Sequence, residues 1–538
     1  MIAKGMGRSL AFALVLCLAC SSVALASDDT ALTDLEASFL NLINYDNPEK
    51  TAVDLTEKIG ARFTGTFRRD MTVEYLMDAF RDAGYDPYIH EFTTPVPYVN
   101  GSIEMLGEKY VYYGNVASDD TAYKFSGEKT VTGAAFLSWP DASADLTLPD
   151  EADYEGKVVF VTMDGGNMPP RDNNTLFYNA AQKLQSANAG AVVFEYYQPA
   201  ADGNTSYRRI ENMPAAGKAS ITIPVGTALY HETHKVLKDL GDTTKIVLTM
   251  KADNRGKNVV AVLPSINGDK KTVYVTSHLD SQLSTPGMND NASGVIMTLE
   301  MARAFRRVPF EHNVSFVVFD AEEVGLIGAK AFCADMTDEE RGNFIANYNM
   351  DMIATSQADC IHMFLNISDR RLQALEETLS DDKRLIALPA AVEIAKEYEV
   401  FNTSYLAAQK TGFDMDYFNI CYDRTTDHYA FVLEAEKFAD GRFDNMLNAV
   451  EYDWRKNEKG TAFEKLYHKT GDTFEINYSR ERCKMVSDIV ALSIYQSAKA
   501  IEWSDSGSSG CDAGTMPTLA LFALAAAAIL RRRKRHWH

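Results

Sequence analysis

Apolar runs and amphipathic stretches alternate along the second half of the chain. Strands that alternate with helices are typical of an α/β protein, in which helices cover a sheet. This half therefore predicts such a sheet, closed by a long helix over 485–503. The strands are expected at 258–263, 273–277, 313–319 and 345–351, and the intervening helices at 293–305 and 326–334.

The first 250 residues show a different pattern. Helical stretches before residue 84 lead into a strand over 86–92, with Gly84 as a helix stop. Short strand-like runs and turns follow, interrupted by two helical segments. We expect 100–252 to be an inserted, mainly β domain. It would separate an N-terminal part, 27–99, from the main part of the α/β domain, 253–505.

The N-terminal residues resemble an export signal. Lys4 and Arg8 accompany an apolar run, and Ala24-Leu25-Ala26 offers a cleavage site. Residues 1–26 therefore predict a cleaved signal peptide and export. An uncleaved anchor remains an alternative, and Cys20 leaves a lipoprotein signal open.

The C-terminal end has three parts. A linker and a short Gly/Cys motif occupy 506–515 and include Cys511, and an apolar stretch and a basic cluster follow in 516–538. This order resembles the sorting tails of some Gram-negative bacteria. The resemblance implies cutting near Cys511 and location at the cell surface or outer membrane, or release. Without cutting, the apolar helix would hold the chain in a membrane, with the basic cluster on the cytoplasmic side.

Charge and length narrow the possible partners. The 538 residues carry −22; the two ends contribute +2 and +4, which leaves −28 for 27–510. So acidic a body repels nucleic acid and excludes it as a partner.

The length predicts two or more domains, whereas nothing indicates an oligomeric state. Three disulfide pairings are possible among four cysteines of this body, which are Cys333, Cys360, Cys421 and Cys483.

Carboxylates and imidazoles follow the predicted strands. Sites in open α/β sheets form where strands end, so these side chains are expected to meet. Adjacent buried carboxylates are costly without a partner, and a divalent cation removes that cost. Histidine together with carboxylate oxygen suits zinc. The set comprises His278, Asp280, Asp290, Glu322, Glu323, Asp351 and His468.

The motifs around these residues resemble those of the two-zinc aminopeptidases of metallopeptidase family 28. The resemblance covers about 257–503 and reaches the lead-in at 59–65, and the insert resembles a protease-associated domain. It implies a zinc-exopeptidase fold, with a mixed β-sheet and helices on both faces. The motifs are His278-Leu-Asp280, Asn289-Asp-Asn-Ala-Ser-Gly294, Asp320-Ala-Glu-Glu-Val-Gly-Leu326, Asn349-Met-Asp351 and Tyr467-His-Lys-Thr-Gly-Asp-Thr473.

The resemblance implies a role for each residue. Asp290 would bridge two Zn²⁺ ions, with His278 and Asp351 completing one site and Glu323 and His468 the other. Asp280 would orient His278. Glu322 would be the general base, and Tyr467 would hydrogen-bond the oxyanion. The peptide bond between Asp290 and Asn291 would be cis.

One motif departs from the family pattern. Many relatives carry Arg-Ser-Asp before an aromatic residue or histidine, whereas this chain has Arg424-Thr-Thr-Asp427-His428. Arg424, Asp427 and His428 are candidate substrate-binding residues. The displaced arginine leaves recognition of the substrate terminus open.

The sequence predicts an exported zinc exopeptidase acting on peptides, most simply an aminopeptidase with a preference for apolar terminal residues. Three alternatives stay open: a carboxypeptidase or dipeptidase of the same superfamily, a glutaminyl-cyclase-like enzyme, and a non-catalytic binding protein. The complete ligand set argues against the last. His231-Glu-Thr-His234 resembles a zincin motif but lacks one spacer residue, so no metal is expected there.

Overall fold

The computed structural model describes residues 31–503 except 47, 116, 142–143, 151, 165–173, 198–212, 284, 358–361, 367–398, 416–417, 422–423, 436–445, 451–463 and 502. The predicted signal peptide and the C-terminal tail lie outside the described residues. Within them, no helix is both long and apolar enough to cross a membrane. Cys333 and Cys483 are both buried.

One mixed sheet runs through the described residues. Fourteen strands follow the order β13-β12-β14-β11-β9-β10-β8-β1-β2-β7-β6-β5-β4, with β3 paired to β8. The strands are β1 (Tyr88–Met105), β2 (Glu108–Gly114), β3 (Gly127–Thr132), β4 (Ala134–Trp139), β5 (Val158–Asp164), β6 (Ala191–Tyr197), β7 (Val225–Ala228), β8 (Lys245–Leu263), β9 (Thr272–His278), β10 (Asn313–Phe319), β11 (Phe344–Asp351), β12 (His362–Asn366), β13 (Phe418–Cys421) and β14 (Met446–Val450).

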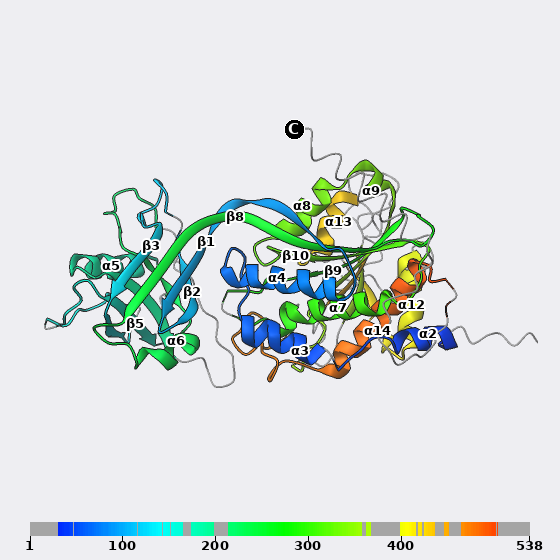
Figure 1. Cartoon of the computed structure of the whole chain (residues 1–538), viewed down its shortest axis with the longest axis horizontal. Helices are drawn as coiled ribbons and strands as arrows, with labels where there is room; N and C mark the ends of the chain where they lie inside the picture. The colour runs from blue at the N-terminus through cyan, green and yellow to red at the C-terminus, as the bar shows by residue number, and fades with distance from the viewer. Residues whose placement is uncertain are drawn as a thin grey trace, which may run out of the picture.

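Helices cover both faces of the larger lobe (Figure 1). Successive side chains of a strand point to opposite faces, so Phe316 and Val318 of β10 join one apolar cluster while Val317 and Phe319 join another. The first cluster includes α7 (Ser293–Phe305) and α14 (Arg480–Ser497), and the second includes α8 (Ile327–Asp335) and α13 (His428–Ala435). The predicted fold class is confirmed.

The remaining helices are mostly short. Both predicted ends of the closing helix are wrong. α14 begins at Arg480 rather than 485, because Ser479 caps it and its charged first turn carries little apolar signal. It ends at Ser497 rather than 503. The other helices are α2 (Asp34–Leu40), α3 (Pro48–Val53), η1 (Asp54–Ile59), α4 (Phe67–Asp82), α5 (Asn174–Ser186), α6 (Tyr230–Leu237), η2 (Met288–Ala292), α9 (Asp338–Gly342) and α12 (Glu399–Lys410).

Two long strands connect the larger lobe to a smaller one (Figure 1). β1 and β8 pair antiparallel from Tyr88↔Val260 to Met105↔Ile246, with one irregularity between Thr93 and Tyr98. The predicted domain boundaries at 100 and 252 fall inside these strands, and the division itself stays a prediction. The smaller lobe holds parallel strands β4 to β7 and has its own apolar clusters.

The smaller lobe contains a buried glutamate whose burial makes the unfolding free energy depend on pH. Glu195 of β6 is 0% exposed and accepts a hydrogen bond from Thr233, while its Oε2 has no partner among the described residues. Burial raises the pKa of Glu195 to about 7, against the opposing effect of the Thr233 hydroxyl. Between the pKa of the unfolded chain and about pH 7, the folded protein therefore holds a proton at Glu195 that the unfolded chain has released.

Glu195→Gln should reduce the pH dependence of stability. Because its pKa is raised in the folded state, Glu195 makes a contribution to stability that is fully present below its pKa in the unfolded chain. This contribution is lost as the pH rises through about 7. The wild type should lose about 3 kcal/mol of unfolding free energy between pH 5 and 8 at this group, and the variant should not. Thermal unfolding across this pH range measures the difference. Exposed Glu128 provides the control as Glu128→Gln, and an equal pH slope in wild type and Glu195→Gln would contradict the prediction.

Candidate metal centre

The carboxyl ends of three parallel strands build one side of the site. His278 is the last residue of β9, and Asp351 is the last residue of β11. The pairing of Asn349 with Thr276 brings these two ends level. Glu322 and Glu323 follow β10, whose last residue pairs with His278. The parallel register therefore gathers side chains that lie far apart in the sequence.

Asp290 enters the site from the turn before α7. Its peptide bond to Asn291 is cis, as predicted. The backbone N–H groups of Asn289 and Asp290 donate to the Asp472 carboxylate at 2.8 and 3.1 Å. On the other side, the Asn291 amide donates to the Met350 carbonyl at 2.9 Å. These contacts fix the direction in which the Asp290 carboxylate points.

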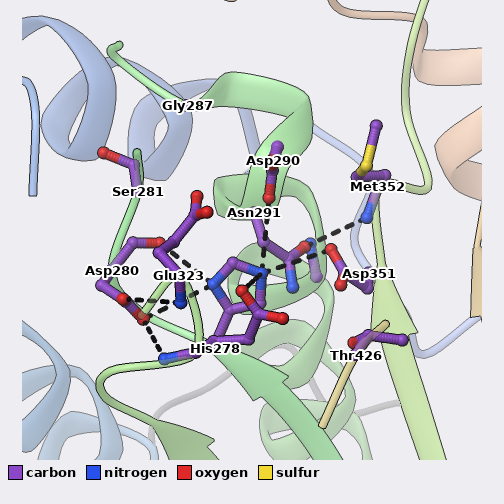
Figure 2. A network of polar contacts seen from close by, with 12 residues as sticks. His278, Asp280, Ser281, Gly287, Asp290, Asn291, Glu323, Asp351, Met352 and Thr426 are labelled. Atoms are coloured by element: carbon purple, nitrogen blue, oxygen red, sulfur yellow. Dashed lines mark hydrogen bonds and ion pairs between the residues drawn. The ribbon is translucent and has the colours of Figure 1, made fainter. Parts of the chain in front are cut away.

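The five predicted ligands form two groups that share Asp290. One is His278, Asp290 and Asp351, and the other is Asp290, Glu323 and His468; within each, the potential ligand atoms lie within 4.8 Å of one another. Asp290 Oδ1 is 3.4 Å from His278 Nε2, and Asp290 Oδ2 is 3.1 Å from His468 Nε2. Figure 2 shows Asp290 facing His278 and Asp351.

These separations fit a metal ion. Two ligands at about 2.0–2.1 Å from a tetrahedral zinc lie roughly 3.3 Å apart. The corresponding distances are 3.3 Å from His278 Nε2 to Asp351 Oδ1 and 3.3 Å from His468 Nε2 to Glu323 Oε2. Glu323 Oε1 is also buried without a hydrogen-bond partner in the described part of the chain. Two carboxylates and one imidazole in each group are ligand types that zinc accepts.

The site carries more negative charge than its imidazoles can balance. Burial alone would lower the pKa of His278, but Asp351 and Glu322 raise it well above its usual value. The pKa of His468 is raised to about 10, because Asp290 and Glu323 outweigh the effect of burial. Burial, followed by the charge of Asp290, raises the pKa of Glu323 to about 7. A divalent cation would replace the protons that these groups otherwise retain.

Asp280 connects the two sides of the site. His278 Nδ1 lies 3.6 Å from its carboxylate and 3.1 Å from its backbone carbonyl. The backbone N–H groups of Glu322 and Glu323 donate to its two carboxylate oxygens, each at 3.2 Å. Asp280 thus lies where it can orient His278, and its carboxylate also holds the backbone of both glutamates. Figure 2 shows Asp280 beside His278 and Glu323.

Glu322 belongs to neither ligand group. Its Oε2 is 3.9 Å from His278 Nε2, and burial together with the nearby charges of Glu323 and Asp427 raises its pKa well above the usual range. A carboxylate beside a metal site with this bias can accept a proton from water. The ring of Tyr467 stacks on the ring of His468, and burial raises the pKa of its phenol, so the hydroxyl remains a donor.

The candidate substrate-binding residues differ in their exposure to solvent. Asp427 and His428 are 0% exposed, and both Asp427 oxygens lack a hydrogen-bond partner among the described residues. Arg424 is exposed, and its guanidinium lies over the Tyr429 ring. His231 and His234 lie on α6 in the smaller lobe. The roles proposed for Arg424, Asp427 and His428 remain predictions.

Sequence reasoning missed two supporting residues of the site. Asp472 was noted only as part of a motif, yet it holds the turn that carries Asp290. Glu464 accepts a hydrogen bond from Asn477, which also donates to Asp472. The closeness of Asp472 to His468 in the sequence was the available signal. The partner of Asp472, however, is Asn289, which lies 183 positions away.

The mixed sheet and the paired ligand groups define an α/β protein with a candidate metal centre at the carboxyl edge of its strands. Residues 258–494 match the model of peptidase family M28. The predicted resemblance to this family is confirmed over these residues, and so is the prediction of a peptidase.

Similar proteins extend beyond this segment. Aminopeptidase YwaD of Bacillus subtilis is 24% identical over 456 residues, which cover 84% of each chain. Probable leucine aminopeptidase 2 of Aspergillus oryzae is 24% identical over 443 residues, covering 80% of this chain and 79% of the relative. A zinc aminopeptidase structure from Bacillus subtilis aligns with a TM-score of 0.48 at 21% identity, covering 86% of this chain and 98% of that one.

Proposed function

We propose that this chain is a two-zinc aminopeptidase that removes single residues from the amino ends of peptides. The observation that carries the proposal is the sharing of Asp290 between two groups of three ligands. Zinc, when bound there, would lower the pKa of a water molecule and polarise the scissile carbonyl. His278 and Asp351 would hold one ion, and Glu323 and His468 the other.

The residues beside the ligands supply proton transfer and charge stabilisation. Glu322 takes a proton from the attacking water as the new C–O bond forms to the carbonyl carbon. It then passes this proton to the amine, which leaves as the peptide C–N bond breaks. The Tyr467 hydroxyl donates a hydrogen bond to the carbonyl oxygen as negative charge develops on it. Asp280 keeps His278 and both glutamates in place through the contacts described above.

The charge of the site favours a substrate with a free amino terminus. Glu322 and Asp427 are carboxylates gathered near the ligands, and an α-ammonium can pair with such groups. A substrate carboxylate would instead need an arginine or lysine. Arg424 is the residue that the sequence suggested for this role, but its guanidinium lies over the Tyr429 ring. An apolar preference is supported by Leu283 and Val324, which are partly buried beside the site.

The cellular setting is proposed from the sequence and the smaller lobe. The chain would be exported by its N-terminal signal and placed at the cell surface or outer membrane, or released, after cutting near Cys511. The smaller lobe would be a protease-associated domain. Its own apolar clusters and the approach of one of them to Leu283 and Val324 support a lobe that borders the substrate site.

Matched peptides with free and acetylated amino termini test the proposed activity. The purified chain should remove an apolar N-terminal residue from the free peptide and leave the acetylated one intact, because acetylation removes the ammonium. A zinc chelator should abolish cleavage, and added zinc should restore it. Trimming of the blocked peptide from its carboxyl end would overturn the aminopeptidase assignment. Cyclisation of N-terminal glutamine without peptide cleavage would point to the cyclase alternative.

A further inference from the structure

Arg62 is a buried arginine that contacts backbone carbonyls close to the metal-binding edge. It lies between η1 and α4 and is 0% exposed. Nε donates to Leu279 at 2.9 Å, Nη1 to Pro286 at 2.5 Å, and Nη2 to Gly287 at 2.9 Å. Nη1 also contacts the carbonyls of Leu55 and Gly60 at 3.3 and 3.4 Å.

The contacted loop, described at 279–283 and 285–287, connects two of the candidate metal ligands. It begins directly after His278 and ends three residues before Asp290, and Figure 2 shows Gly287 on the chain leading to Asp290. The guanidinium therefore donates hydrogen bonds to both ends of the loop. The backbone N–H of Arg62 also donates to Ser281 Oγ at 3.0 Å, in the middle of the same loop.

The loop is also tied to the segment that carries His468. Ser281 Oγ donates to the Thr285 carbonyl at 2.9 Å, and Thr285 Oγ1 donates to the Lys469 carbonyl at 2.7 Å. Lys469 follows His468 directly. A displacement of the loop would thus move the ligands of both groups and not only the two residues at its ends.

The Arg62 charge is buried within an acidic surrounding. Burial lowers the pKa of Arg62 to about 10, with Asp472, Asp280 and Asp290 acting in the opposite direction, so the group is charged at neutral pH. Within the described part of the chain, the hydrogen bonds of its guanidinium all go to carbonyl oxygens. The positive charge of Arg62 can therefore attract the carboxylates of the site, while its hydrogen bonds leave their oxygen atoms available to a metal ion.

We propose that Arg62 is a positioning residue that sets the separation of His278 and Asp290 and so prepares both ligand groups for metal. The inference rests on the proposed function, because it assumes that these groups bind zinc. Lysine cannot substitute fully, since one ammonium nitrogen does not match the planar fork that reaches Leu279, Pro286 and Gly287 together.

Zinc affinity is the measurement that isolates this role. Arg62→Met should weaken zinc binding about 10–100-fold, the range found when groups that orient metal ligands are removed, and Arg62→Lys should lose less. Affinity is measured by competition with a zinc-binding fluorescent indicator, well below the unfolding temperature. Peptidase activity of both variants should be low at limiting zinc and recover in excess zinc.

A matched control separates this effect from general damage to the N-terminal segment. Arg68 is nearly as buried and forms a two-point contact with Glu232 of α6 at 2.6 and 2.8 Å, away from the loop. Arg68→Met should lower thermal stability and leave zinc affinity unchanged. Equal weakening of zinc binding in Arg62→Met and Arg68→Met would count against a specific role for Arg62.

A second variant disturbs the loop and keeps the arginine. Gly287 has φ +62°, and an added Cβ would lie 2.4 Å from the Asp290 carbonyl oxygen and 2.6 Å from Ser281 Cβ. Gly287→Ala should therefore weaken zinc binding in the same direction. It also tests the inference if Arg62→Met fails to fold.

The possible outcomes are distinguishable. Wild-type affinity in folded Arg62→Lys and Gly287→Ala, with only a lowered Tm, would overturn the inference and make Arg62 a stabilising residue alone. A wild-type chain that binds no zinc at all would instead refute the proposed function. Weakened binding in these variants, rescued by excess metal, supports both.

Discussion

Glu322→Gln is expected to lower kcat about 10²–10⁴-fold while zinc content stays at the wild-type level. The substitution keeps the size of the side chain but removes its ability to accept a proton. Glu322 belongs to neither ligand group, so metal should remain bound. Steady-state kinetics and elemental analysis on the same preparation measure the two effects.

A buried glutamate far from the chemistry provides the matched control. Glu300 of α7 is 1% exposed and pairs with Arg303. Glu300→Gln should reduce stability without a comparable fall in kcat. Near wild-type kcat in Glu322→Gln would assign the proton transfer to another group. A loss of zinc in that variant would instead show that Glu322 binds metal.

Much of the site was predictable because strand ends carry local signals. The apolar runs before His278, Glu322 and Asp351 marked three strands, and the parallel arrangement of such strands brings their carboxyl ends to one edge. Asp290 and His468 do not follow directly on a predicted strand, and the resemblance to family 28 is what gave each of them a role in the site. The structure brings all five predicted ligands together.

The contacts that hold the ligands were not predictable from local patterns. Arg62 and Gly287 are 225 positions apart, and Asp472 and Asp290 are 182 apart. Residues so distant leave no periodic signal, and a buried arginine looks like any surface arginine in a sequence. The start of α14 was missed for a related reason, since its first turn is polar and only the Ser479 cap marks it.

The extent of the insert illustrates a different difficulty. A change in the pattern of apolar and polar residues near 100 and 252 indicated two domains. Strand β1, however, runs through position 100, and strand β8 runs through position 252. A strand that serves two cores keeps the same alternation along its length, so the pattern does not mark the point at which it passes from one lobe to the other. The separate clusters appear only when side-chain contacts are known.

Asp290→Asn should remove more metal than the loss of any ligand that serves one group. Asp290 presents Oδ1 to His278 and Oδ2 to His468, so its replacement weakens both sites. Asp351 approaches only His278 among the two imidazoles and provides the matched variant, Asp351→Asn. We expect about two zinc ions per wild-type chain, about one in Asp351→Asn and almost none in Asp290→Asn.

Zinc-dependent stabilisation provides an independent measure of the same difference. A ligand that binds only the folded state at about 1,000 times its Kd raises the unfolding free energy by about 4 kcal/mol per site. Added zinc should therefore raise the Tm of the wild type most, of Asp351→Asn less, and of Asp290→Asn hardly at all. If both variants lose one ion and retain the same thermal response, Asp290 serves a single site. The second ion would then need a carboxylate other than Asp290, and Glu322, whose Oε2 lies 3.9 Å from His278 Nε2, would be the first to test.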